Sequence, residues 1–274
     1  MKCRRTRLRQ TEHRRAERET GVPAAAIRQM AHAYAKAPRA QLCWTLGITE
    51  HHNAVDTVVS LINLTILTGH VGRYGSGVNP LRGQNNVQGS CDMGSFPHEY
   101  PGYRHVSDEA TRRQFERAWQ VPLLSEPGLR IPNMFEAALD GEFKALYIQG
   151  EDIAQSDPNT QHVTAAMTAM ECIIVQDLFL NESAKFAHVF LPGSSFLEKD
   201  GTFTNAERRI SPVRKVMRSK SGYADWEITQ LLANAMGLAM NYRHASEIMD
   251  EIASLTPTFT GVSFEKLERL GSIQ

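Results

Sequence analysis

Short apolar runs alternate along the chain with segments in which apolar residues recur at helical spacing. Four apolar runs, each bounded by polar or turn-forming residues, are typical of buried strands: residues 41–46, 145–148, 172–175 and 188–192. Helices are expected between and around them, over residues 24–37, 55–67, 109–119, 134–139, 160–170 and 184–186. Strands that alternate with helices indicate a parallel sheet wrapped by helices. The pattern therefore predicts an α/β fold with three layers, a mostly parallel sheet and flanking helices.

The boundaries of the first two helices carry recognisable signals. Thr20 is a candidate N-cap, and Pro23 suits the first turn of the helix that follows it. Gly69 and Gly72 follow the helix over 55–67, where glycines commonly end helices. We therefore expect both helices to begin and end close to these residues.

Three of the predicted strands are followed by polar loops. These loops are residues 47–51, 150–152 and 176–177. In parallel sheets, ligands bind beyond the carboxyl ends of the strands. The three loops are therefore expected to line one edge of the sheet and to offer amides, carboxylates and backbone groups to a polar heterocycle or a nucleotide.

A long polar stretch, RYGSGVNPLRGQNNVQGSCDMG, covers residues 73–94, and we expect neither a regular helix nor a strand in it. Its glycines allow backbone to approach a ligand closely, and its Asn and Gln side chains both donate and accept hydrogen bonds. Such loops are usually either functional or disordered. Apolar residues punctuate this one, which favours an ordered, functional loop.

The two ends of the chain differ from the middle. Residues 1–19 are rich in arginine and lack apolar periodicity, and we expect a solvated, disordered segment, although basic runs can also bind nucleic acid. After residue 195 the chain turns polar and glycine-rich, then basic as far as Lys220. Two amphipathic helices are expected there, over 226–236 and 245–255, with no cap or turn signal at the end. This irregular and helical extension, residues 196–274, is expected to pack against further parts of a larger protein.

Composition excludes several classes of function. The 274 residues carry 30 Lys and Arg against 30 Asp and Glu, so net charge indicates no particular partner and we expect no nucleic acid. No apolar run is long enough to span a membrane and no secretory signal follows the basic start, so a cytoplasmic protein is expected. The four cysteines form no close pair, which argues against zinc or an iron–sulfur cluster. No nucleotide-binding glycine motif, hydrolase motif or metalloprotease motif is present.

Several side chains could carry chemistry, and each has an ordinary structural alternative. Arg82 could hold a carboxylate through two hydrogen bonds, but a loop arginine more commonly pairs with a nearby acid. His51 and His52 could be acid–base groups or ligands, and could equally be surface residues. Asp152 and Asp177 could accept hydrogen bonds from ribose or guanine, or could cap the next helix.

The run PLRGQNNVQGSCDMG, residues 80–94, resembles the signature loop of formate dehydrogenases in the molybdopterin oxidoreductase family. Further similar segments occur in the same order: LGITEHHNAVD, LTGHVGRYGSGVNP, YIQGEDIAQSDP, VQDLFLNESAKFAHVFLP and EKDGTFTNAERR. The resemblance covers about residues 20–274. It implies that residues 20–195 belong to an α/β domain that binds bis-molybdopterin guanine dinucleotide (bis-MGD).

The resemblance assigns roles to individual residues. It places Arg82 beside the metal, where it would orient formate, and Gln84 against a pterin. The other implied cofactor-binding residues are Leu46, Gly47, Glu50, His51, Gly150, Asp152, Ser156, Gln176 and Asp177. Glu50 stands where the family commonly has glutamine, and Ser156 where it has threonine. No residue of this chain is implied as a metal ligand.

What the resemblance implies for function is the oxidation of formate to CO2 at bis-MGD-bound molybdenum or tungsten in a larger parent subunit. The family's metal-ligating cysteine or selenocysteine, its adjacent histidine and its [4Fe–4S] motif have no counterpart here, so we expect no turnover by this chain alone. Expected partners are formate, the other domains of the subunit and electron-transfer subunits. Three alternatives remain open: a cofactor-handling protein, a non-functional gene fragment, and a relative of nitrate reductase.

Overall fold

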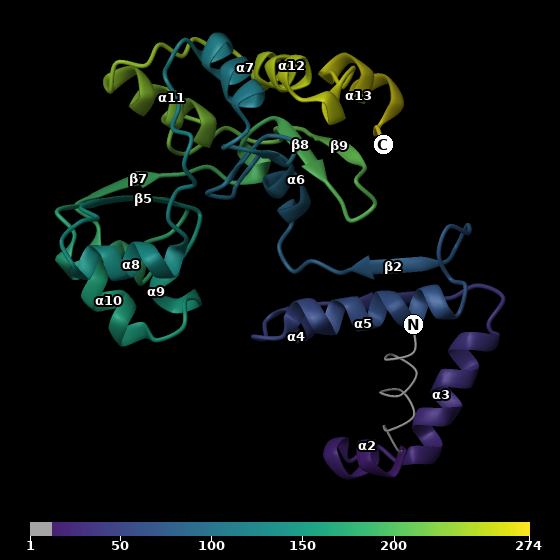
Figure 1. The fold of residues 1–274 in the computed structure, drawn as a ribbon. Coiled ribbons are helices and arrows are strands. Elements are labelled where there is room, and N and C mark those ends of the chain that lie inside the picture. The colour runs from purple at the N-terminus through teal and green to yellow at the C-terminus, as the bar shows by residue number, and fades with distance from the viewer. Residues whose placement is uncertain (1–12) are drawn as a thin grey trace. The chain divides into compact units, whose positions relative to one another are not determined.

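The computed structural model describes residues 13–274, which form two compact units, with the division of the chain after Gly83. The elements of both units are labelled in Figure 1. The boundary expected near residue 195 falls inside the second unit. Residues 1–12, part of the segment expected to be disordered, lie outside the described residues.

The first unit contains four helices and a two-stranded parallel sheet within the residues described. The helices are α2 (His13–Thr20), α3 (Ala24–Lys36), α4 (Leu46–Thr49) and α5 (Ala54–Leu67), and the strands are β1 (Gln41–Trp44) and β2 (Gly77–Pro80). Gln41 pairs with Gly77 and Trp44 with Pro80. The buried imidazole of His70 contacts the ring of Tyr34, and its Nε2 lies 2.9 Å from the Tyr34 carbonyl oxygen. Helix α3 and the turn after α5 are thereby joined.

Four expectations for this unit need correction. Residues 13–20 form a helix instead of a disordered segment, stabilised in part by an Arg15–Glu19 ion pair one turn apart. Thr20 ends that helix and donates to the Ala16 carbonyl, so it does not cap α3. A short helix occupies part of the expected loop after β1, and β2 lies within the stretch where no strand was expected. Helices α3 and α5 were predicted correctly, and Gly69 and Gly72, the two glycines expected after α5, both have a positive φ.

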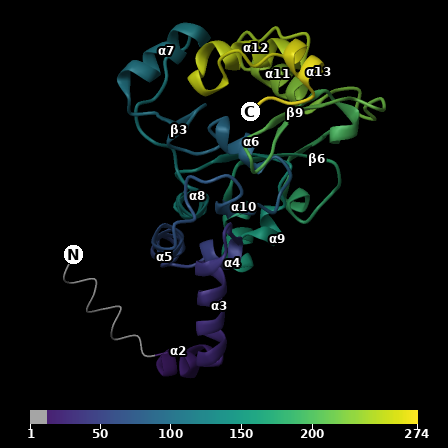
Figure 2. The ribbon, with the colours of Figure 1, turned by 90° about the vertical axis from the view of Figure 1, so that its right-hand side faces the viewer.

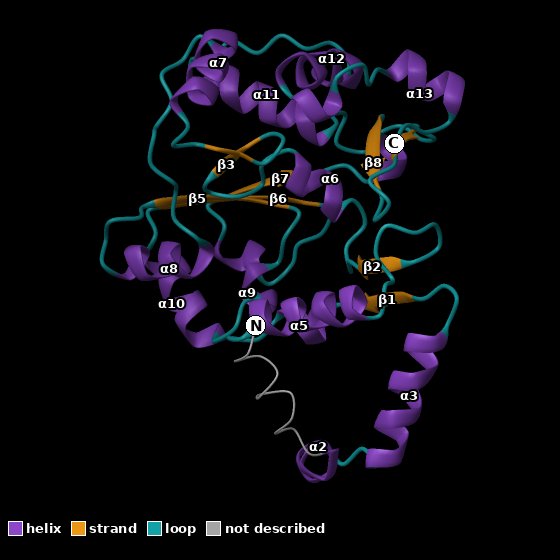
Figure 3. Ribbon diagram, turned by 45° about the vertical axis from the view of Figure 1, so that its right-hand side comes forward, coloured by secondary structure: helices purple, strands orange, loops and turns teal. Residues whose placement is uncertain are grey.

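The second unit is built on a three-stranded parallel sheet in the order β5-β6-β7. These strands are β5 (Ala145–Gln149), β6 (Cys172–Asp177) and β7 (Val189–Pro192). Figures 1 and 3 show α8 (Ile131–Leu139), α9 (Ile153–Ser156) and α10 (Thr160–Ala169) on one side of the sheet and α11 (Asp225–Ala235) on the other. Ile173 and Val175 on the central strand are fully buried against α8 and α10. The prediction of parallel strands flanked by helices is thus confirmed.

The strand β1 does not belong to this sheet. It pairs with β2 in the first unit, whereas β5, β6 and β7 form a sheet of their own. The three polar loops expected at one sheet edge therefore follow strands of two different sheets. Apolar runs reveal buried strands but carry no information on which strands pair, which explains the error.

The remaining elements of the second unit include those that form a second core. They are α6 (Val87–Asp92), β3 (Glu99–Tyr100), β4 (Arg104–His105), α7 (Glu109–Trp119), the 3-10 helices η1 (Ser183–Phe186), η2 (Phe196–Glu198) and η3 (Pro257–Phe259), the antiparallel pair β8 (Gly201–Thr204) and β9 (Ile210–Val213), α12 (Ala245–Leu255) and α13 (Phe264–Leu270). Ile210, Met249, Phe259, Val262 and Leu267 are buried together. Figure 2 shows α7, α11, α12 and α13 gathered beyond the sheet.

This part of the chain is more regular than expected. The hairpin of β8 and β9 was not predicted, and neither was α13, which Ser263 caps at its start and Gly271, in a left-handed conformation, ends. Helix α6 also lies within the stretch expected to lack helix. Among residues 13–274, no helix has both the length and the apolar character needed to cross a membrane.

Candidate functional site

A cavity of about 430 Å³ opens at the carboxyl ends of β5, β6 and β7. Its lining comes from five short segments of the second unit: Gln149, Gly150, Gln176, Asp177, Leu178, Gly193, Ser194, Ser195, Phe196, Lys199 and Asp225. The cavity lies where parallel sheets usually bind ligands. It brings together three of the residues predicted from sequence, Gly150, Gln176 and Asp177. The loops after β5 and β6 therefore meet as expected.

Gln176 is buried at the end of β6, although sequence placed it in a loop. Its amide is held from both sides: the Tyr147 hydroxyl donates to Oε1, and Nε2 donates to Asp225 Oδ1 at 2.8 Å. A buried amide with both ends bonded has one fixed orientation. Gln176 thus positions Asp225, the first residue of α11, at the cavity wall.

Lys199 and Asp225 form an ion pair at this wall. The Lys199 ammonium also donates to the Ser194 carbonyl at 3.0 Å, and the Ser194 amide donates to Asp225 Oδ1 at 3.2 Å. Burial by itself raises the pKa of the Asp225 carboxyl, but the hydrogen bonds from Lys199 and Gln176 outweigh burial and leave that pKa below its ordinary value. The cavity therefore holds a carboxylate that stays ionised and a cation beside it.

Two glycines keep the cavity open. Gly150 has a φ of +65°, which favours glycine, and its amide donates to the Gln176 carbonyl at 2.9 Å. At Gly193, a Cβ atom would lie 2.9 Å from Asp225 Oδ1, too close for an unstrained contact. Any side chain at residue 193 would displace the Asp225 carboxylate.

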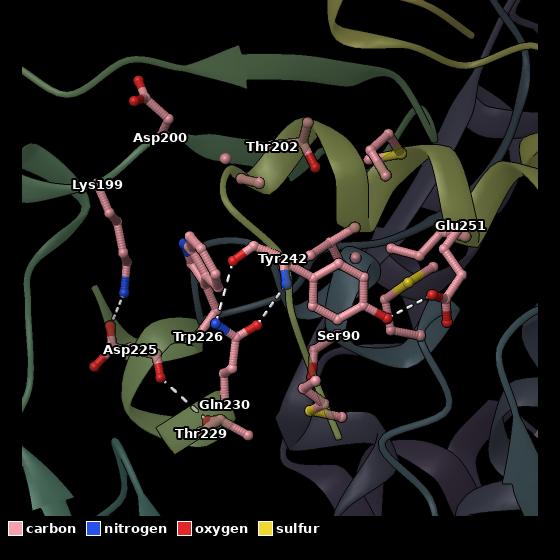
Figure 4. Close-up of a pocket in the computed structure, with 18 of the residues that line it drawn as sticks. Ser90, Lys199, Asp200, Thr202, Asp225, Trp226, Thr229, Gln230, Tyr242 and Glu251 are labelled. Atoms are coloured by element: carbon pink, nitrogen blue, oxygen red, sulfur yellow. Dashed lines mark hydrogen bonds and ion pairs between the residues drawn. The ribbon is translucent and has the colours of Figure 1, made fainter. Parts of the chain in front are cut away.

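A larger cavity of about 760 Å³ adjoins the first and shares Gln149, Lys199 and Asp225 with it. Figure 4 shows Lys199 pointing toward Asp225 on one side and Tyr242 pointing toward Glu251 on the other. The Glu251 carboxylate accepts from the Tyr242 hydroxyl at 2.5 Å and from Trp119 Nε1 at 2.9 Å. Burial and the neighbouring Glu251 raise the pKa of Tyr242, so its hydroxyl remains a donor. The Lys199–Asp225 pair thus lines both cavities.

We call the cavity at the carboxyl ends of β5, β6 and β7 the sheet-edge cavity. Asp152 and Ser156 are not among the residues that line it. The Asp152 carboxylate accepts from the Ser183 amide at 2.9 Å and from Ser183 Oγ at 2.6 Å, and it makes no capping bond to α9. Burial acts to raise the pKa of Asp152, but these bonds prevail and lower it. Ser156 Oγ donates to Glu151 at 2.7 Å. Asp152 therefore fixes the start of η1, a third role beside the two considered from sequence.

The remaining predicted residues include five in the first unit. Leu46 and Gly47 lie in α4 and Glu50 at its end, and the Gly47 carbonyl lies 2.9 Å from His51 Nε2. Arg82 is exposed and forms no ion pair within residues 13–274, so the expectation of a structural partner for it is not met. Gln84, in the second unit, is exposed as well. The roles implied for these residues stay predictions.

Lys199, Asp225 and Ser194 were not singled out from the sequence. Lys199 lies in a polar stretch and Asp225 opens a helix, and both are common surface positions. Only the folded chain brings them to Gln176. A weak signal was present, because Lys199 falls in the EKDGTFTNAERR segment. Within the described residues, no group of three or more His, Cys, Asp or Glu side chains is arranged to hold a metal ion.

Comparison with known proteins places the chain in a family. The molybdopterin oxidoreductase family model matches residues 6–235. Formate dehydrogenase H of Escherichia coli is 44% identical over 257 residues, which are 93% of this chain and 36% of that protein. The "Probable oxidoreductase YjgC" of Bacillus subtilis is 42% identical over 260 residues, 94% of this chain and 26% of that protein. The chain thus spans about a quarter to a third of these relatives.

A solved structure shares the fold. Acetylene hydratase from Pelobacter acetylenicus superposes with a TM-score of 0.70 at 16% identity, covering 98% of this chain and 40% of the other. This similarity concerns the fold alone. With the family match extending over most of the sequence, the chain belongs to the molybdopterin oxidoreductase family.

Proposed function

We propose that this chain is the part of a formate dehydrogenase subunit that holds bis-MGD and orients formate. The observation that carries the proposal is the cavity at the carboxyl ends of β5, β6 and β7, in a chain of this family. The name of the Escherichia coli relative supports formate as the substrate. The reaction proposed for the parent enzyme converts formate to CO2, a proton and two electrons.

The residues of the second unit fit a guanine nucleotide. Guanine presents N–H donors, and the cavity offers the carboxylates of Asp177 and Asp225 as acceptors. Phosphate groups are anionic, and Lys199 provides a positive charge at the same wall. Gly150 and Gly193 line the same cavity and carry no side chain, which allows the backbone to approach a ligand closely. We therefore assign this cavity to the nucleotide end of the cofactor.

The molybdenum or tungsten centre carried by bis-MGD supplies the acceptor for the two electrons of formate oxidation. In this proposal Arg82 binds the carboxylate of formate through two hydrogen bonds, which fixes the direction of its C–H bond. The guanidinium has no competing ion pair within residues 13–274. Iron–sulfur clusters and electron-transfer subunits of the parent enzyme would carry these electrons onward.

A chimera tests the proposal. Residues 20–274 would replace the matching segment of the Escherichia coli enzyme, and formate-dependent dye reduction and bound pterin would both be measured. Arg82→Lys should lower kcat/KM for formate roughly ten- to hundredfold, because a charged bidentate contact is lost, while pterin content stays unchanged. Arg130→Lys, which alters another exposed arginine, is the matched control. Near-normal formate oxidation by the Arg82→Lys chimera would remove the role given to Arg82.

The nucleotide assignment has its own readout. Asp225→Asn in the same chimera should reduce bound pterin guanine dinucleotide, because the cavity loses its ionised carboxylate. Asp140→Asn, at the end of α8, serves as the control. Unchanged cofactor content in the Asp225 variant would contradict the assignment of this cavity.

A further inference from the structure

The segment from Arg214 to Lys220, RKVMRSK, concentrates positive charge on the surface of the second unit. It follows β9 and carries four cations and no acid: Arg214, Lys215, Arg218 and Lys220. All four are exposed, and none forms an ion pair within residues 13–274. A protein with a formal net charge of zero thus presents a local excess of positive charge.

The segment is held in a defined conformation by its own backbone. The amides of Val216 and Met217 both donate to the Leu197 carbonyl, at 2.9 and 3.1 Å. The Lys215 amide donates to Asp200 Oδ1 and the Lys220 amide to Glu198 Oε1, each at 2.9 Å. Two carboxylates thus bond the backbone of the segment, and a third, Glu227, lines a pocket together with Lys215. The four cations still outnumber these three acids. A surface that is already ordered loses little entropy when a partner binds.

Apolar side chains are exposed among the cations. Val216 is 71% exposed and Met217 45%, and on the adjoining η2 Phe196 is 51% and Leu197 41% exposed. The hydrogen bonds from Val216 and Met217 to Leu197 hold residues 214–220 beside η2, so the four apolar side chains belong to adjacent segments. We name Phe196, Leu197 and residues 214–220 the basic–apolar surface. Exposed apolar side chains ringed by charge are typical of protein–protein interfaces.

We propose that the basic–apolar surface docks an acidic protein partner that also presents apolar side chains. Nucleic acid would use the cations but would gain little from exposed Val216 and Met217, since its backbone contacts are with charged and polar groups. An acidic protein surface uses both: its carboxylates steer the encounter, and its apolar side chains bury those of the surface. Phe196 also lines the cavity at the carboxyl ends of β5, β6 and β7, whereas residues 214–220 do not. The proposal requires neither formate nor bound cofactor, because the four cations lie in the segment outside that cavity.

The test uses the purified full chain and three probes: an amphipathic acidic peptide of glutamate and leucine, a DNA duplex, and vesicles containing an anionic phospholipid. Binding is measured by fluorescence anisotropy or vesicle sedimentation at several salt concentrations. R214E/R218E should weaken peptide binding on the order of tenfold at low salt. V216S/M217S should weaken it also at high salt, where charge is screened. R28E/R130E, with the same charge change at exposed arginines elsewhere, is the matched control and should stay within about twofold of the wild type.

Several results would overturn the proposal. One is equal weakening by R214E/R218E and R28E/R130E, which would mean a general charge effect. Another is tighter binding of the DNA duplex or the vesicles than of the peptide, with V216S/M217S unchanged. Absence of measurable peptide binding would also refute it. Circular dichroism of each variant checks that the fold is retained.

Discussion

Two glycines with the same backbone conformation offer a stringent test of packing in the second unit. Gly94, between α6 and β3, has a φ of +78°, and a Cβ atom there would lie 2.7 Å from the Tyr100 carbonyl carbon and 2.9 Å from the Glu99 carbonyl oxygen. Gly141, after α8, also has a φ of +78°, but nothing lies within 4 Å of its Cβ position. The two alanine substitutions therefore differ in one respect: the new Cβ atom collides with backbone at residue 94 and meets nothing at residue 141.

The expected magnitudes follow from these distances. The left-handed conformation costs alanine roughly 1–2 kcal/mol, and the loss of chain entropy in the unfolded state offsets about 0.4–1 kcal/mol of this. Both quantities apply equally to the two glycines. Overpacking against rigid backbone adds roughly 1–3 kcal/mol at Gly94 alone. Gly94→Ala should therefore lower the free energy of unfolding by about 1–3 kcal/mol more than Gly141→Ala.

Urea unfolding monitored by tryptophan fluorescence measures this difference. A Trp44→Phe background removes the tryptophan of the first unit and leaves Trp119 and Trp226, which both belong to the second unit. The signal then reports unfolding of the unit that contains both glycines. Equal losses of stability for the two variants, or a larger loss for Gly141→Ala, would refute the close packing of Gly94 against residues 99–101.

Three further predictions concern the core and two titrating groups of the second unit. Ile173→Ala on the fully buried central strand should lower the free energy of unfolding by about 2–5 kcal/mol; a loss below that range in chemical denaturation would contradict the packing of β6. Burial and the hydrogen bond to Asp92 raise the pKa of Tyr103 to about 12. The neutral hydroxyl should therefore stabilise the fold at pH values below the unfolded pKa of Tyr103, and this stabilisation should be lost as pH rises through the folded pKa. Ultraviolet titration of wild type against Tyr103→Phe measures that pKa, which should fall in Asp92→Asn. Because the pKa of Asp225 is lowered in the fold, its contribution to stability is present above the unfolded pKa and is lost as pH falls through the folded pKa. Lys199→Met should raise the folded pKa of Asp225, as measured by NMR titration of the carboxyl group. An unchanged pKa would exclude the ion pair.

The sequence by itself determined most of the local structure. Apolar runs located β5, β6 and β7, and helical periodicity located α3, α5, α7 and α12 to within a residue or two. These features are predictable because they depend on residues close together in the chain. The resemblance of residues 80–94 to the family's signature loop was likewise readable, because the order of residue types within one segment carries it.

Shorter elements escaped prediction for a physical reason. The strands β2, β8 and β9 are each four residues long and contain glycine, asparagine, threonine or proline, so no apolar alternation marks them. Each is stabilised by pairing with another strand, and β2 pairs with a strand more than thirty residues earlier. Helix α13 was missed although Ser263 and Gly271 bound it, because seven residues give little periodicity.

Tertiary structure decided which residues surround the sheet-edge cavity. Gln176 and Asp225 are 49 residues apart in sequence, and Lys199 lies between them, yet hydrogen bonds join all three. Local sequence does not encode such contacts, since they depend on how β6, η2 and α11 pack. The separation of β1 from β5–β7 has the same origin, because strand pairing is chosen by long-range packing. The strands of the second unit and the signature segment could therefore be predicted from sequence. Only the tertiary structure showed that the Asp225 carboxylate and the Lys199 ammonium line the cavity.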